Sequence, residues 1–231
     1  MVVKAESKKL LIKQKAYYDP SVNKQQWYAH QCPEKFILYG GAKGGGKTAW
    51  GINEGIRLSL EYPGNRGFMG CRDGTDFKRN AYDQLMYFLP AELYAPPLGV
   101  HHKTDQYIRL IDGSVICYGG IGNEQESEQK INNLGQLGWF FIDQAEQISE
   151  RQFLQLAGQL RWNLYKKDMI YKGLLTANPD PGWLRDRFIE HSYPDHIYIP
   201  ALPKDNPFKP SDYEEKLREI YPADMVKKLL E

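Results

Sequence analysis

A glycine-rich stretch that ends in a lysine and a threonine has the residue types and the spacing needed to hold a chain of phosphates. Residues 41–48 read Gly-Ala-Lys-Gly-Gly-Gly-Lys-Thr and match the pattern G-x-x-x-x-G-K-[ST] without a mismatch. In such a loop the lysine, here Lys47, reaches the β- and γ-phosphates, and the hydroxyl of Thr48 holds Mg²⁺. Glycines are needed because a Cβ would block the approach of the backbone to the phosphates. We therefore expect ATP with Mg²⁺ at Gly41, Ala42, Lys43, Gly44, Gly45, Gly46, Lys47 and Thr48.

The segments on either side of this loop predict a strand and a helix. Residues 35–40 form a short apolar run typical of a buried strand, and residues 48–62 carry apolar side chains at helical spacing. A helix that begins at the loop directs the positive end of its dipole toward a bound phosphate. A chance glycine-rich turn would not require these flanks, so the context favours a nucleotide-binding loop.

A second apolar run ends in an acidic residue, a pattern typical of the Mg²⁺ site of P-loop ATPases. Residues 138–142 predict a buried strand, and Asp143 follows at its end, where a carboxylate can bind Mg²⁺, usually through water. Asp143 lies 96 residues after Lys47 (143 − 47), which leaves room for a further strand between the two strands that carry them.

The residue after Asp143 bears directly on hydrolysis. ATPases with a dedicated base carry Glu at this position, whereas this chain has Gln144. An amide cannot accept a proton from the attacking water, and loss of a positioned general base costs about 10²–10⁴-fold in rate. Gln144 therefore marks the general-base position of an impaired site. Either a Glu→Gln change was made to trap bound ATP, or the natural protein has Gln here and uses another base. Glu146 is expected to point elsewhere on the following turn.

Other polar residues could contact further parts of the nucleotide. Gln25, shortly ahead of the first predicted strand, could pair with the adenine edge because its amide both donates and accepts; the alternative is an ordinary residue on a surface helix. Thr176 and Asn178 follow a strand predicted over residues 169–175. At the tip of a strand next to Asp143, they could sense the γ-phosphate and pass its state to neighbouring elements.

A further cation near the γ-phosphate, from this subunit or a neighbouring one, would stabilise the transition state. Arg161 lies near the end of a predicted helix, where it could serve this role or act as an ordinary cation at a helix C-terminus. Arg72 and Arg79 lie at and beyond the end of a predicted strand, and Lys130 lies in a polar stretch; surface ion pairing is expected for Arg79. All four residues stay open as candidates. The predicted catalytic set is Gln144, Lys47 and Arg161.

Composition indicates a soluble α/β domain from a reducing compartment. The chain has 231 residues, 42% hydrophobic and 26% charged, which is ordinary for a globular protein with a sizeable core. Thirty Lys+Arg against 29 Asp+Glu give a net charge of +1, so binding of nucleic acid would need a local patch or several subunits. Three scattered cysteines fit neither a zinc site nor a disulfide framework. No apolar stretch has the length of a membrane span or the form of a signal peptide.

The rest of the chain predicts alternating strands and helices with one inserted hairpin. The hairpin is centred on Asp112-Gly113, between residues 106–111 and 114–118, and residues 119–133 are predicted to form a mobile loop. The other predicted elements are strands over 66–72, 169–175 and 196–200 and helices over 76–89, 149–165, 182–189, 211–220 and 222–231. The predicted divisions are a basic N-terminal arm over 1–24, a P-loop ATPase core over 25–205 and a C-terminal helical extension over 206–231.

Together these motifs resemble the large terminase subunit of tailed bacteriophages, the ATPase that pumps DNA into a procapsid. The phosphate loop is shared by many families, but its combination with Thr-Ala-Asn-Pro at 176–179 is much more specific. The resemblance covers about residues 20–231. It is carried by residues 39–48, 141–148, 160–162, 175–183 and 205–208.

The resemblance implies an α/β P-loop NTPase fold of the additional-strand (ASCE, RecA-like) type, with a mostly parallel central sheet flanked by helices. It also implies a soluble motor in the host cytoplasm that forms a ring on the portal protein and acts on double-stranded DNA with the small terminase subunit. The isolated domain could be monomeric.

The chain departs from the family pattern in three ways. The family has Glu at the position of Gln144, so hydrolysis by this chain is in question although binding is not. The family's nuclease carboxylates would lie beyond residue 231, so no DNA cleavage is expected. Lys43 stands where the family often has Arg; a lysine keeps the charge but loses the bidentate fork.

Two other classes of function compete with this interpretation. A helicase or related nucleic-acid remodelling ATPase would need a second RecA-like domain, for which 231 residues leave no room. A non-hydrolysing, nucleotide-dependent assembly switch is supported directly by Gln144 alone. Restoring Glu at this position separates a motor from a switch, because a motor would regain turnover and a switch would not.

Overall fold

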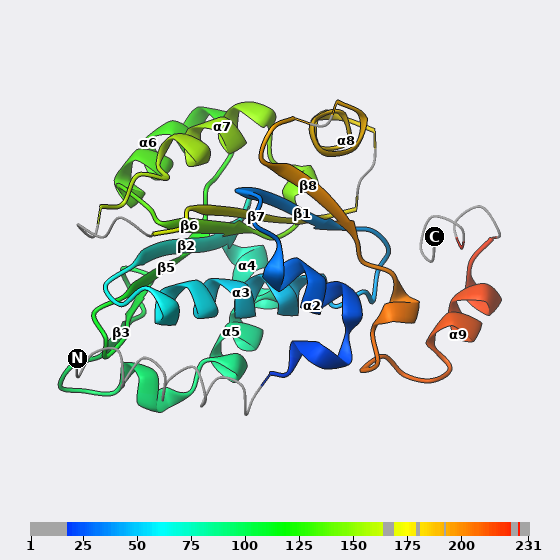
Figure 1. Ribbon diagram of the computed structural model, residues 1–231, viewed down its shortest axis with the longest axis horizontal. Coiled ribbons are helices and arrows are strands. Elements are labelled where there is room, and N and C mark those ends of the chain that lie inside the picture. Colours follow the sequence, from blue (N-terminus) through cyan, green and yellow to red (C-terminus); the bar gives the residue numbers. More distant parts are fainter. Residues whose placement is uncertain (1–17, 164–168, 179–180, 192, 223–225, 227–231) are drawn as a thin grey trace.

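A twisted eight-stranded sheet runs through the molecule (Figure 1). The computed structural model describes residues 18–163, 169–178, 181–191, 193–222 and 226. Most of the predicted basic arm (1–17) and most of the helix predicted over 222–231 lie outside these residues. The strand order is β3-β4-β5-β2-β6-β7-β1-β8. The strands are β1 (Phe36–Gly40), β2 (Arg66–Cys71), β3 (Val100–His102), β4 (Tyr107–Arg109), β5 (Val115–Gly120), β6 (Trp139–Ile142), β7 (Lys172–Ala177) and β8 (His196–Pro200).

The order of the central strands confirms the additional-strand fold. Strand β7 pairs in parallel with β1 on one side and with β6 on the other, so it separates the strand before the glycine loop from the strand before Asp143. Strands β2 and β5 extend the parallel part of the sheet beyond β6, and β8 extends it beyond β1. Because the strands are parallel, their carboxyl ends meet at one edge, where ligands bind in open α/β sheets.

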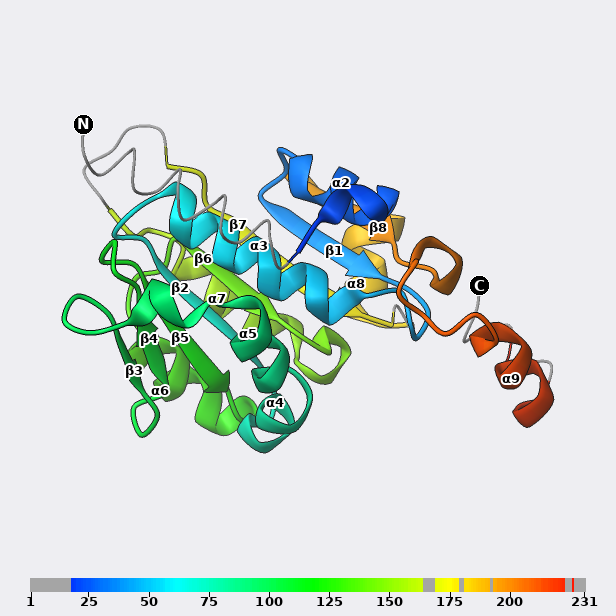
Figure 2. The ribbon, with the colours of Figure 1, turned by 90° about the horizontal axis from the view of Figure 1, so that it is seen from below.

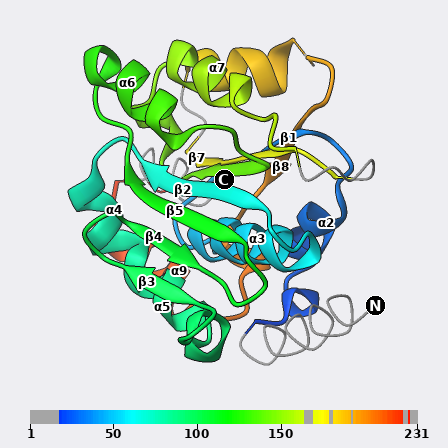
Figure 3. The same cartoon turned by 90° about the vertical axis from the view of Figure 1, so that its left-hand side faces the viewer.

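Helices cover both faces of this sheet (Figures 1 and 3). Helices α2–α5 pack on one face around Trp50 and Trp139, and α6–α8 pack on the other around Phe140 and Phe153. Because both faces are covered, the central strands β1 and β6 are buried at every position rather than at alternate positions. The helices are α2 (Lys24–Gln31), α3 (Lys47–Glu61), α4 (Gly74–Asn80), α5 (Tyr82–Phe88), α6 (Glu124–Leu134), α7 (Glu150–Gly158), α8 (Trp183–Arg185) and α9 (Tyr213–Ile220).

Helix α3 lies unusually close to the sheet because it presents glycines to two large aromatic rings. A Cβ at Gly51 would overlap with the ring of Phe141, and a Cβ at Gly55 would lie 2.7 Å from the ring of Trp139. Both aromatic residues belong to β6. The glycines therefore let the helix that follows the phosphate loop pack directly against the strand that leads to Asp143.

The predicted hairpin is confirmed, but it is part of the main sheet. Strands β4 and β5 are antiparallel, β3 adds a further antiparallel strand, and β5 continues into the parallel sheet through β2. Figure 2 shows this end of the sheet at the side opposite to α9.

Three predicted elements were wrong in type or extent. The helix predicted over 76–89 is two helices, α4 and α5, which meet at Ala81. The mobile loop predicted over 119–133 contains helix α6, which Asn123 caps through its side chain. The prediction over 149–165 is too long, because α7 ends at Gly158, although its N-cap, Ser149, forms a complete capping box. In the described part of the chain, no helix is long and apolar enough to cross a membrane.

Candidate nucleotide-binding site

The glycine loop joins the end of β1 to the start of α3 at the carboxyl edge of the sheet. Gly44 and Gly46 have φ angles of 86° and 74°, a region that favours glycine. Gly45 has a different need, since a Cβ there would lie 2.5 Å from the carbonyl oxygen of Ala201, just after β8. Across the loop, Nδ2 of Asn206 donates to the Gly44 carbonyl at 2.7 Å. The loop is thus held in shape by the segment that follows β8 as well as by its own glycines.

Lys47 lies at the centre of the loop. Its Nζ donates to the carbonyl oxygens of Gly41 and Ala42 at 2.8 and 2.7 Å and to Oδ1 of Asn178 at 3.0 Å. Burial lowers the pKa of Lys47 to about 8, against the carboxylates of Glu146 and Asp143, which raise it. The ammonium group therefore links the loop to the tip of β7.

Asp143 accepts hydrogen bonds from two threonines. Thr48 Oγ1 lies 3.2 and 3.0 Å from its two carboxylate oxygens, and Thr176 Oγ1 lies 2.5 Å from Oδ1. Asp143 is 7% exposed, and burial raises its pKa although both hydroxyl donors act to lower it.

This cluster has the chemistry of a Mg²⁺ site that is completed by phosphate. All its donor atoms are oxygen, the donor that Mg²⁺ prefers, and they lie beside the lysine of the loop. Within the described ranges, no group of three or more His, Cys, Asp or Glu residues could hold a metal by itself. One carboxylate and one hydroxyl, Asp143 and Thr48, fit a Mg²⁺ ion that arrives with a nucleotide.

These groups line a cavity of about 540 Å³, which is within the usual range for small-molecule sites. Ten of the predicted site residues face it. They are Lys43, Gly44, Gly45, Gly46, Lys47, Thr48, Asp143 and Gln144, together with Thr176 and Asn178 at the tip of β7. Gly41 and Ala42 are not part of the wall and contribute their carbonyls to Lys47 instead.

The turn after Asp143 differs from the prediction. Gln144 has left-handed backbone angles (φ 56°, ψ 49°), and the short helical turn η3 (Ala145–Gln147) follows it. The Oε1 atom of Gln144 accepts a hydrogen bond from Nε2 of Gln147 at 3.2 Å. Glu146 lines the cavity, so the expectation that it points elsewhere was wrong. The sequence pattern could not show this, because the direction of Glu146 depends on the left-handed backbone angles of Gln144.

The structure separates the four candidate cations. Arg79 lines the cavity, from α4 and together with Asn80 and Gln84, which fits its place among the candidate cations better than the expected surface ion pairing. Arg72 is not part of the cavity wall. Lys130 pairs with Glu126 at 2.9 Å and lines a different cavity. Arg161 donates to the Gly158 carbonyl at 2.9 Å on an exposed surface, and it does not reach the site of its own chain.

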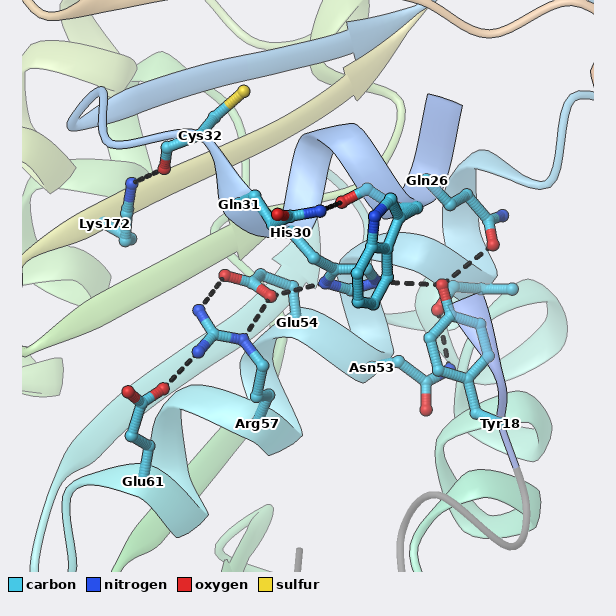
Figure 4. A network of polar contacts seen from close by, with 12 residues as sticks. Tyr18, Gln26, His30, Gln31, Cys32, Asn53, Glu54, Arg57, Glu61 and Lys172 are labelled. Atoms are coloured by element: carbon cyan, nitrogen blue, oxygen red, sulfur yellow. Dashed lines mark hydrogen bonds and ion pairs between the residues drawn. The ribbon is translucent and has the colours of Figure 1, made fainter. Parts of the chain in front are cut away.

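The glutamine that contacts the loop is Gln26 and not Gln25. Gln25 does not line the cavity. The side chain of Gln26 is buried, and its Nε2 donates to the Gly46 carbonyl at 3.0 Å while Oε1 accepts from Tyr18 at 2.8 Å. The Tyr18 hydroxyl also lies 2.9 Å from His30 Nε2 (Figure 4). Gln26 thus supports the loop through its hydrogen bond to Gly46. The sequence did not distinguish Gln26 from Gln25, because neighbouring residues of a helix point in different directions.

The family can now be assigned. A family model described as phage terminase large subunit matches residues 34–228. The chain belongs to this family. The matched range includes the loop, Asp143 and the β7 tip, while no curated protein matches the chain.

Solved large terminases share its fold. A large terminase from a thermophilic bacteriophage superposes with a TM-score of 0.73 at 15% identity, covering 90% of this chain and 52% of that one. The large terminase ATPase domain of Thermus phage P74-26 matches with a TM-score of 0.59 at 12% identity over 89% of this chain and 90% of that one. The HK97 bacteriophage large terminase gives 0.57 at 14% identity over 92% and 50%. This terminase-family chain spans about half the length of the longer structures that it matches.

Proposed function

We propose that this terminase-family chain is the ATP-binding and ATP-hydrolysing motor domain that drives translocation of viral double-stranded DNA into a procapsid. The observation that carries the proposal is the convergence of Lys47, Thr48, Asp143 and Asn178 in one cavity at the carboxyl edge of the sheet. A large terminase similar in fold has been solved with ADP and with ATP-γ-S. The family assignment supplies the packaging context.

The residues of the site suit binding and turnover of ATP. The glycine loop would surround the phosphates with backbone N–H groups, and Lys47 would exchange its carbonyl partners for the β- and γ-phosphates. Thr48 and Asp143 would hold Mg²⁺, which neutralises phosphate charge. Arg79, on the cavity wall, would add a cation toward the γ-phosphate, whereas Arg161 would be left for a neighbouring subunit.

Asn178 would couple the state of the phosphate to the rest of the molecule. In this structure its side chain accepts from Lys47, at the tip of a strand that pairs with both β1 and β6. A phosphate that draws Lys47 away would break its hydrogen bond to Asn178. Thr176, on the same strand, would still donate to Asp143. Self-association into a ring and contacts with DNA, a portal protein and a small terminase subunit belong to this proposal.

Nucleotide binding is the first test. We expect Mg²⁺-dependent binding of a fluorescent ATP analogue to the parent chain and a loss of roughly 100-fold or more in affinity for Lys47→Ala, because the charge at the β- and γ-phosphates is removed. Arg151→Ala, which changes an exposed cation outside the cavity, is the matched control and should bind normally. Equal binding by the parent chain and Lys47→Ala would contradict the proposal.

The motor role has its own test. Turnover that rises when double-stranded DNA is added is expected for a translocating domain. A non-hydrolysing switch, which the amide of Gln144 favours, would bind the nucleotide but show no turnover under any of these conditions.

A further inference from the structure

We infer that Glu146 is the general base for ATP hydrolysis in this chain and takes the role that a glutamate directly after Asp143 has in related ATPases. The inference rests on the proposed function. In the step, the oxygen of a water attacks the γ-phosphorus as the bond from the β–γ bridging oxygen to that phosphorus breaks. The Glu146 carboxylate takes the proton from the water, and ADP leaves with the electron pair of the broken bond.

The backbone brings Glu146 into the wall of the cavity that Lys47 and Asp143 also line. Gln144 adopts left-handed angles directly after Asp143, which reverses the chain and starts turn η3. This turn packs against β7, and Ala145 is buried beneath it in the sheet's second core. As a result, Glu146 lines the same cavity wall as Lys47, Asp143 and Asn178.

The surroundings of Glu146 are those of a usable carboxylate base. The side chain of Glu146 is exposed on the cavity wall, and Lys47, whose Nζ donates to the side chain of Asn178, is an opposite charge that acts on it. Partial desolvation raises the pKa of Glu146, although the backbone N–H groups of Glu146 and Asn178 and the Lys47 ammonium act to lower it; Asp143 adds to the rise. Lys43 and Arg79 are the other charged groups on the cavity wall. A carboxylate of raised pKa accepts a proton more readily than an ordinary one.

Gln144 is engaged in a different way. Its side-chain oxygen accepts from Gln147, and an amide has no proton-accepting form at neutral pH. Gln144 therefore helps to hold the turn that presents Glu146 and is a positioning residue. In this chain Gln144 would shape the turn and Glu146 would act as the base. In related ATPases one glutamate has both roles.

The test compares Glu146→Gln with the parent chain, measuring ATP turnover and affinity for a Mg²⁺-bound fluorescent ATP analogue in the same samples. Glu128→Gln is the matched control, because Glu128 is an exposed carboxylate outside the cavity wall. We expect Glu146→Gln to lower turnover about 100-fold or more while affinity stays within threefold, since Gln keeps the shape and loses only the base. Glu128→Gln should change neither.

Two results would overturn the inference. One is a fall of less than tenfold in turnover for Glu146→Gln with affinity retained. The other is a parent chain that binds ATP but turns it over no faster than Lys47→Ala, while Gln144→Glu restores turnover, which would mean that the base is truly missing. Failure of the proposed function looks different, because the parent chain would then either not bind the Mg²⁺-bound analogue at all or bind it and show no turnover even in Gln144→Glu.

Discussion

At the scale of single residues, the two central charged groups of the site, Lys47 and Asp143, are hydrogen-bonded to neighbouring groups of the protein. Lys47 is held by two carbonyls and an amide oxygen, and Asp143 by the hydroxyls of Thr48 and Thr176. Each of these contacts must be exchanged or shared when a nucleotide binds. The affinity measured for the nucleotide is therefore a difference between two sets of interactions, as in most polar sites.

Thr176→Val removes one hydroxyl donor from Asp143 and keeps the shape of the side chain. We expect Mg²⁺-dependent affinity for the ATP analogue to fall by roughly 10-fold, because groups that orient a metal ligand typically contribute this much. Titration with Mg²⁺ at a fixed analogue concentration measures the effect. Thr104→Val, in an exposed turn, is the control. An unchanged midpoint for Thr176→Val would show that Thr48 orients Asp143 alone.

Glu54, buried on α3, predicts a dependence of stability on pH. Burial alone would raise its pKa, but Arg57 and His30, in contact at 2.7 and 2.6 Å, lower it to about 2 (Figure 4). Because the folded pKa is below the usual 4.5, the stabilisation is present above pH 4.5 and is lost as the pH falls toward 2. It amounts to on the order of 3 kcal/mol.

Urea unfolding of the parent chain and of Glu54→Gln between pH 7 and pH 2 checks this. The difference in unfolding free energy between the two should shrink across the window from pH 4.5 to pH 2, because the glutamine does not titrate. A difference that stays constant with pH would contradict the assignment of this window to Glu54.

At the scale of elements, the sequence could predict the parts of the site whose geometry is local. The loop, Asp143 and Thr176 lie at the ends of apolar strands. A parallel sheet brings the carboxyl ends of its strands to one edge, whatever helices and loops connect them. The sequence placed Arg79 among several candidate cations and could not single it out, and the direction of Glu146 depends on the left-handed residue Gln144. This backbone conformation is not given by the local residue pattern.

Helix α6 shows a second limit of pattern. Its residues are mostly polar, and only Ser127 and Ile131 are buried, so its apolar stripe is too narrow to distinguish it from a loop. The Asn123 cap, whose side chain accepts from the N–H groups of residues 125 and 126, was the signal available in the sequence.

The close packing of α3 on β6 predicts the effect of one methyl group. Gly51→Ala places a Cβ within the ring of Phe141, so either the helix or the strand must move. We expect a loss of roughly 1–3 kcal/mol in unfolding free energy and weaker Mg²⁺-dependent binding, because Thr48 moves relative to Asp143. Gly158→Ala, which has open space at the end of α7, is the matched control. Equal stability of the two variants in urea unfolding would contradict this account of the packing.

At the scale of the whole molecule, the cavity lies where both cores meet the sheet edge. The loop after β1 and the start of helix α3 contribute one wall, and the residues at the ends of β6 and β7 contribute another, so one ligand would bridge elements that pack in different clusters. A ligand of this kind stabilises the folded chain as a whole and not one element of it.

Binding of the ATP analogue should therefore raise the melting temperature. At an analogue concentration 100 times the dissociation constant, with Mg²⁺, the stabilisation is about 2.7 kcal/mol, or roughly 5–10 °C for a chain of this size. Thermal unfolding with and without the ligand measures it. Lys47→Ala, with an affinity at least 100-fold lower, should gain about 0.4 kcal/mol or less at the same concentration, a shift of roughly 1 °C. A shift equal to that of the parent chain would place the binding elsewhere.

The contact between Asn206 and the Gly44 carbonyl has a consequence for where this ATPase can be cut. Asn206 belongs to the segment predicted to follow the core, yet it lines the nucleotide cavity and bonds to the phosphate loop. The ring of Tyr213, further along, lies against the same glycine. A shortened protein that stopped at residue 205 would keep every sequence motif of the site and lose part of its wall. The cavity wall therefore extends beyond residue 205, and a chain cut there would lose a hydrogen bond that holds the glycine loop.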